Sequence, residues 1–114
     1  MLASELQVFK DTENFVFEII KLYPQLPKTH KYTIGVCLYN TSLDLLDFII
    51  KANRHKENRV SYLEDFLDCF EKCETLLRLL KKGQLISTKK ETEFALMSVK
   101  IGKQIRGWKN ASAS

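Results

Sequence analysis

Residues 28–54 read KTHKYTIGVCLYNTSLDLLDFIIKANR, the longest stretch of the chain that keeps one hydrophobic period without a proline. One line of a 3.6-residue helical wheel collects Gly35, Leu38, Tyr39, Ser42, Leu46 and Ile49. The opposite, polar arc holds Thr33, Asn40, Asp44, Asp47 and Lys51. The remaining apolar residues widen the apolar arc well beyond the roughly 100° that one core-facing stripe requires. The stretch therefore predicts a long helix that needs partners on several sides.

A first helix is predicted over residues 4–23, before the long one. Ser4 and Gln7 have the spacing of a capping box, and Pro24 ends the helix because proline removes a helical hydrogen-bond donor. The connection to residue 28 is then so short that the second helix must fold back against the first. The polar run 53–59, after the second helix, predicts an exposed loop.

Two more helices are predicted in the second half of the chain, over residues 61–82 and 88–109. Ser61 with Glu64, and Thr88 with Glu91, have the spacing of capping boxes. Gly83 stands where a left-handed C-terminal cap is expected. Residues 110–114 are expected to form a frayed tail.

Four helices with short connections predict an all-α fold, an up-down-up-down antiparallel four-helix bundle that makes residues 1–114 a single domain. No run alternates with period two, which disfavours a β or α/β fold. No apolar run approaches about 18 residues, and the N-terminus lacks a basic region followed by an apolar block. We therefore expect a cytoplasmic protein with no membrane span and no signal peptide.

The sequence lacks the residue sets that are typical of metal sites and catalytic sites. His30 and His55 stand at opposite ends of the long predicted helix, about 35–40 Å apart at about 1.5 Å per residue, too far to share a metal. Cys37, Cys69 and Cys73 lie in helical patterns beside leucine and phenylalanine, where buried free thiols are expected. No Ser-His-Asp set or glycine-rich phosphate loop is present. The sequence predicts no enzyme, no metal and no cofactor.

Basic residues gather where the first and third helices end and the second and fourth begin, which we call the basic end. It holds Lys21, Lys28, His30, Lys31, Arg78, Lys81, Lys82, Lys89 and Lys90, whereas Glu74, Glu91 and Glu93 are the acids expected near it. The chain carries a net charge of +4. Such a cluster suits phosphate contacts, because lysine and arginine that neutralise phosphates release counterions. The alternative is that these cations serve only the helix dipole and solubility.

The last helix carries a mixed outer face. Lys100, Lys103, Arg106 and Lys109 lie opposite its apolar side, and Leu96 and Val99 point outward with them. Together with Phe17 and Leu79, which point outward from the first and third helices, these two residues predict an oligomer interface. The alternative is a scatter of ordinary surface hydrophobic residues.

Short motifs along the chain resemble one known family. They are Leu26-Pro27-Lys28, then Tyr32, Gly35 and Leu38, then Leu76-Leu77-Arg78-Leu79, and finally Gly-Lys-Gln-Ile-Arg-Gly-Trp at residues 102–108. Over about residues 9–109, this pattern resembles the four-helix-bundle accessory variability determinant proteins of diversity-generating retroelements. Close relatives of that family are the proteins encoded by intervening sequences in bacterial 23S ribosomal RNA genes.

The resemblance implies a protein without an active site of its own. Members of the retroelement family form a basic, barrel-like homopentamer that associates with a reverse transcriptase and its template RNA and supports mutagenic reverse transcription. By position in the motifs, the resemblance implies that Lys28, Lys31, Lys100, Lys103 and Arg106 contact nucleic acid, RNA or DNA, or the polymerase. The alternative is the ribosomal intervening-sequence branch, which implies a structural or protein-interaction module that does not bind nucleic acid.

Overall fold

The structure is a computed structural model that describes residues 1–114 and is helical throughout, with no strand. Its four long helices are α1 (Gln7–Leu22), α3 (Val36–Arg54), α4 (Arg59–Lys82) and α5 (Thr88–Ala113). Short 3₁₀ turns cover Ala3–Glu5, Tyr23–Gln25 and Lys56–Asn58, while α2 (Lys28–His30) continues into α3 through a π-helical turn, Lys31–Gly35. The prediction of an all-α fold with four long helices is confirmed.

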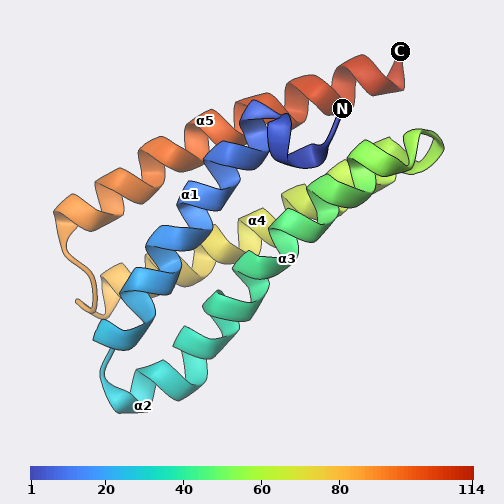
Figure 1. The fold of residues 1–114 in the computed structure, drawn as a ribbon. Coiled ribbons are helices and arrows are strands. Elements are labelled where there is room, and N and C mark those ends of the chain that lie inside the picture. The colour runs from blue at the N-terminus through green and yellow to red at the C-terminus, as the bar shows by residue number, and fades with distance from the viewer.

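The long helices lie alongside one another in an elongated molecule of 44 × 23 × 21 Å. Helix α1 contacts α3 and α5, and α4 contacts the same two helices from its own side. Figure 1 shows each long helix returning along the one before it, with both chain termini at the same end of the molecule. This arrangement is consistent with the expected up-down-up-down bundle, and it places the ends of α1 and α4 near the starts of α2 and α5.

Aromatic rings join three of the helices in the core. The Phe15 ring of α1 lies 5.2 Å from the Phe70 ring of α4 and 5.6 Å from the Phe94 ring of α5, measured between ring centres. Leu45 and Ile49 of α3 are completely buried in the same cluster. Because aromatic pairs at these separations stabilise a core beyond the area they bury, they fix how α1, α4 and α5 pack.

The continuous helix Lys28–Arg54 is long and apolar enough to cross a membrane by length and composition alone. This differs from the expectation that no segment of the chain would reach that threshold. Leu38, Leu45 and Ile49 on this helix are buried against its neighbours. A helix at the core of a soluble bundle meets the same criterion, so the finding is only weak support for a membrane span.

The predicted start of the first helix is wrong. Helix α1 begins at Gln7, after a 3₁₀ turn, and Leu6 at its N-cap makes no side-chain hydrogen bond. The Gln7 side chain donates instead to Asp11 one turn later, at 3.0 Å. Ser4 therefore caps nothing.

The loop between α3 and α4 is shorter than predicted. Helix α3 continues to Arg54 and α4 begins at Arg59, so Ser61 lies within the first turn of α4 and does not cap it. The Arg59 guanidinium donates to the carbonyls of Ala52 and Asn53 at 2.8 and 3.4 Å, which satisfies the C-terminal end of α3.

The ends of the last two helices also differ from prediction. Ser87, one residue earlier than predicted, caps α5 by accepting a hydrogen bond from the Lys90 backbone N–H at 3.0 Å. Gly83 has a φ of −79°, and the left-handed residue is Gln84, with a φ of 60°. The predicted frayed tail is helical as far as Ala113.

Candidate nucleic-acid interface

The structure brings the predicted basic end together from four elements. Helices α1 and α4 end there, and α2 and α5 begin there (Figure 1). The predicted contacts that these elements carry are Lys28, Lys31, Arg78, Lys81, Lys82, Lys89 and Lys90. Lys28, Arg78, Lys82 and Lys89 are exposed, whereas the other three are half-buried. Of the seven, only Lys90 forms an ion pair.

Glu18 neutralises part of this end. Its carboxylate accepts from the Lys21 ammonium at 2.6 Å and pairs with the Lys90 ammonium, which also lies 3.4 Å from Glu93. The hydrogen bonds from Lys21 and Lys90 hold the pKa of Glu18 below its ordinary value, and the bond to Glu18 raises the pKa of Lys90. Sequence reasoning missed Glu18, because it reaches Lys90 only across the α1–α5 contact. Lys90 is therefore a structural ion-pair residue in the isolated chain.

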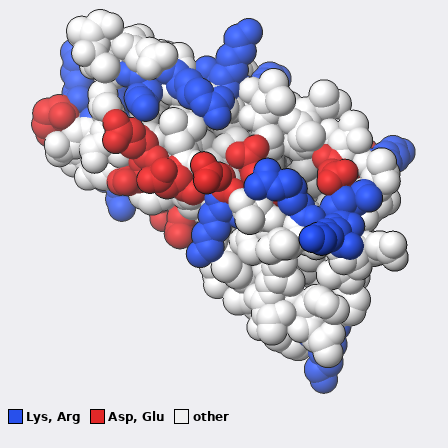
Figure 2. Space-filling model, turned by 180° about the vertical axis from the view of Figure 1, so that it is seen from behind, with Lys and Arg blue, Asp and Glu red and all other residues white.

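Acidic residues are lacking over a long part of the basic end. No aspartate or glutamate lies between Glu18 and Asp44, a stretch that contains Lys21, Lys28 and Lys31. Figure 2 shows no acidic side chain over the tip of the molecule where α2 lies, whereas an acidic band crosses the middle of the same face. The exposed acids of α4 are Glu64, Asp65, Asp68 and Glu71, all at least eleven residues before its end at Lys82. The α2 end therefore carries cations that have no acidic residue beside them.

The predicted contacts on α5 fall into two groups. The Lys100 ammonium lies 3.5 Å from Asp11 of α1, a nearly buried carboxylate that also accepts from Gln104 at 2.8 Å and from Gln7 at 3.0 Å. Burial opposes ionisation of Asp11, but these hydrogen bonds and the Lys100 charge outweigh it and lower the pKa of Asp11. Lys100 is thus turned toward α1, although its side chain remains largely exposed.

Lys103 and Arg106 lie on the other side of α5, toward α4. Both are exposed, and both line a surface hollow together with Phe70, Glu74 and Val99. The Arg106 guanidinium lies over Gly102, where a Cβ atom would come within 2.7 Å of its Nη1. The absence of a side chain at Gly102 therefore lets Arg106 lie along the helix.

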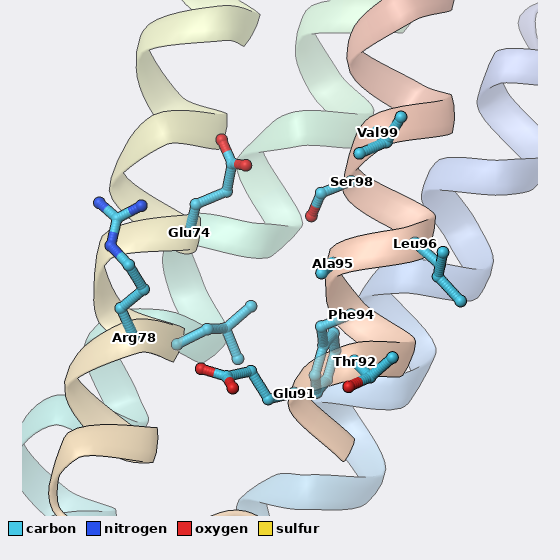
Figure 3. Close-up of a pocket in the computed structure, with 10 residues that line it drawn as sticks. Glu74, Arg78, Glu91, Thr92, Phe94, Ala95, Leu96, Ser98 and Val99 are labelled. Atoms are coloured by element: carbon cyan, nitrogen blue, oxygen red, sulfur yellow. The ribbon is translucent and has the colours of Figure 1, made fainter. Parts of the chain in front are cut away.

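A groove of about 390 Å³ adjoins this hollow between α4 and α5. Its lining residues are Glu74, Leu77, Arg78, Glu91, Thr92, Phe94, Ala95, Leu96, Ser98 and Val99. Figure 3 shows Glu74 and Arg78 on α4 across the groove from Ala95 and Ser98 on α5, with the Arg78 side chain running along α4. Leu96 and Val99 are about 70% exposed, at 69% and 71%. The groove combines apolar walls with charged groups at its ends.

The four predicted interface residues are exposed, as the helical pattern predicted, and they come from three helices. Phe17 and Leu79 are 55% and 50% exposed. Neither lines the groove that contains Leu96 and Val99. Any assembly that covers all four residues must therefore contact α1, α4 and α5.

The three cysteines lie in the α3–α4 contact. The Cys69 thiol donates to the Thr41 carbonyl at 3.2 Å, and Cys37 lies 4.0 Å from the Thr41 hydroxyl. Cys73 is completely buried, and its hydrogen bond with Cys69 raises the pKa of Cys73 and lowers that of Cys69. All three cysteines are free thiols.

Comparison with known proteins gives one family. A family model described as bAvd-like matches residues 6–112 of the chain. The match includes all four long helices, and thus both the basic end and the α4–α5 groove. No curated protein matches the chain.

Proposed function

Because the chain belongs to the bAvd-like family, we propose that it is a non-catalytic, oligomeric accessory protein of a diversity-generating retroelement. In this role it binds nucleic acid and a reverse transcriptase in the cytoplasm and supports mutagenic reverse transcription. The observation that carries the nucleic-acid role is the set of exposed cations at the basic end that have no carboxylate partner, Lys28, Arg78, Lys82 and Lys89.

The charge distribution supports phosphate binding over a purely solubilising role. Cations that only raise solubility are usually interspersed with acidic residues. Lys28 and Lys31 instead lie in a stretch that has no acidic residue between residues 18 and 44. Each lysine or arginine that meets a phosphate releases a counterion, so binding through this end depends steeply on salt. Because backbone contacts carry no sequence information, this end supplies affinity for nucleic acid in general.

The groove between α4 and α5 supports the protein-binding part of the proposal. Leu96 and Val99 expose apolar surface beside Arg106, and protein interfaces combine an apolar buried core with an enrichment in arginine. We assign this face to contact with further copies of the chain or with the polymerase. Replacing Leu96 and Val99 by aspartate should lower the mass measured by light scattering to that of one 13.3 kDa chain. A wild-type protein that is already monomeric at high concentration would remove the oligomer from the proposal.

A charge-reversal experiment tests nucleic-acid binding. The variant Lys28→Glu/Lys82→Glu/Lys89→Glu reverses three exposed, unpaired cations at the basic end. The matched control, Lys10→Glu/Lys51→Glu/Lys56→Glu, makes the same change in net charge at exposed positions away from that end. Binding of both to a structured RNA is measured by fluorescence anisotropy over a salt series. We expect the first variant to lose binding and the control to keep most of it.

Equal loss in both variants would show that net charge alone attracts RNA and would overturn the assignment to the basic end. Absence of binding by the wild-type protein at low salt would favour the alternative, a protein-interaction module of the ribosomal intervening-sequence type. A reverse transcriptase gene and a pair of near-identical repeats beside the gene for this chain would support the retroelement role.

A further inference from the structure

The π-helical turn Lys31–Gly35 changes which residues face solvent at the basic end. Lys31 stands seven residues before the buried Leu38, so in an unbroken α-helix the two would share a face. A π turn adds one residue and rotates the preceding part of the helix by about 100°. Lys31 is therefore moved away from the core line, and its ammonium lies 5.4 Å from the centre of the Tyr23 ring.

Tyr32 is left exposed beside it. Its relative exposure is 62%, whereas Tyr23, Tyr39 and Tyr62 are half-buried and each pairs with another ring. Tyr32 pairs with no ring, and its hydroxyl forms no hydrogen bond. The Lys31 ammonium lies 6.0 Å from the centre of the Tyr32 ring, so a cation flanks an otherwise free aromatic face.

The surroundings of Tyr32 are cationic without compensation. Lys28 is exposed one turn before it, Lys31 adjoins it, and neither has an acidic partner. The other exposed aromatic residue, Phe17, also has a lysine over its ring, at 5.3 Å. That lysine is Lys21, which Glu18 neutralises, so a phosphate near Phe17 would meet a carboxylate. Only at Tyr32 does a free ring face adjoin free cations.

We propose that Tyr32 is a stacking platform for an unpaired nucleobase, with Lys28 and Lys31 holding the adjoining phosphates. This inference rests on the proposed nucleic-acid function and specifies the ligand as single-stranded RNA or DNA. Every base has a π face, so stacking on tyrosine tolerates any sequence, while lysines beside the ring follow the backbone. A paired base inside a duplex is already stacked on both sides and gains nothing from Tyr32.

Substitutions at Tyr32 itself separate ring stacking from apolar contact. Tyr32→Phe keeps the ring, Tyr32→Leu keeps apolar area without it, and Tyr32→Ala removes both. The affinity of each variant for a labelled single strand, and for a duplex of the same length and sequence, is measured by fluorescence anisotropy at fixed salt. We expect Tyr32→Leu and Tyr32→Ala to weaken single-strand binding by about 5-fold to about 150-fold, and Tyr32→Phe to bind like wild type.

Duplex binding should change less than about twofold in all three variants, because phosphate contacts dominate it. The dependence on salt should stay as in wild type in Tyr32→Ala, which removes no charge. A strand that carries 4-thiouridine should crosslink under long-wavelength ultraviolet light to the peptide containing Tyr32.

The outcomes separate this inference from the proposed function. Wild-type affinity of Tyr32→Ala for the single strand, or equal weakening for single strand and duplex, would overturn the stacking platform and leave the basic end intact. Retention of affinity in Tyr32→Leu would also overturn it, because an apolar contact without a ring would then suffice. If the wild-type protein bound neither the single strand nor the duplex, both proposals would be overturned.

Discussion

The Arg59 guanidinium lies 5.4 Å from the centre of the Trp108 ring while it donates hydrogen bonds to the carbonyls of Ala52 and Asn53. One side chain at the start of α4 thus satisfies the end of α3 and contacts the last third of α5. Because α5 carries Lys103 and Arg106, this contact also helps to hold the proposed interface in place.

Replacing Arg59 by alanine should destabilise the protein by about 1–3 kcal/mol, since it removes two charge-assisted hydrogen bonds and a cation–π contact. The free energy of unfolding is measured by urea titration followed by circular dichroism. Arg54→Ala is the matched control, because Arg54 is exposed and makes no side-chain hydrogen bond or ion pair. Equal stability of the two variants would contradict the bridging role.

Two glycine substitutions should have opposite effects. A Cβ atom at Gly35 would lie 2.9 Å from Leu26 Cδ1 and 3.2 Å from the His30 carbonyl oxygen, which belongs to the backbone and cannot easily move. Gly35→Ala should therefore destabilise the π turn by about 1–3 kcal/mol. Gly107→Ala, with nothing within 4 Å of its new Cβ atom, should stabilise α5 by up to about 1 kcal/mol. Thermal unfolding measures both effects: the Tm of Gly35→Ala should be lower than that of wild type, and the Tm of Gly107→Ala should be higher.

Acid should weaken the α1–α5 contact. Folding lowers the pKa values of Asp11 and Glu18 below their ordinary values of 3.8 and 4.5, so their stabilisation is present above those values and is lost as the pH falls through the folded-state pKa values. Wild-type stability should therefore decline below about pH 4.5. Asp11→Asn should be destabilised near neutral pH by about 1–3 kcal/mol and should show a shallower decline in acid.

Urea titrations at a series of pH values measure both effects of Asp11→Asn. Glu13→Gln, an exposed position on the same helix, is the control and should follow the wild-type curve. A decline in acid that is as steep in Asp11→Asn as in wild type would assign the acid sensitivity to other carboxylates.

Removing Glu18 should strengthen nucleic-acid binding. Glu18→Gln leaves Lys21 without a carboxylate partner and Lys90 with Glu93 alone, at 3.4 Å, so Lys21 becomes available to phosphates and Lys90 is held less strongly. The slope of log affinity against log salt should steepen by roughly 0.7–0.9 for each phosphate newly contacted. Anisotropy titrations compare Glu18→Gln with the control Glu13→Gln. The control makes the same change in net charge on α1, at a residue that pairs with no lysine. Identical slopes would show that Lys90 stays out of the interface.

Local sequence pattern determined the helical fold and the exposure of particular side chains. The 3.6-residue period identified all four long helices and placed Phe17, Leu79, Leu96 and Val99 outside the core. Short connections were enough to bring the basic residues to one end, because a helix that ends at a tight turn must be followed by one that runs back. The cap positions were less accurate. Ser4 and Ser61 satisfy a local spacing rule, but α1 begins at Gln7 and α4 at Arg59, and neither serine caps a helix.

Only the tertiary structure decided which cations are free and where the helix is interrupted. Lys90 and Lys100 are paired with Glu18 and Asp11, residues far away in the sequence, because α5 packs on α1 at one particular rotation and height. The π turn depends in the same way on Gly35 packing closely against Leu26. A helical period fixes the direction of each side chain around its own axis. Its partner on another helix depends on how the two axes pack, which is a property of the whole core.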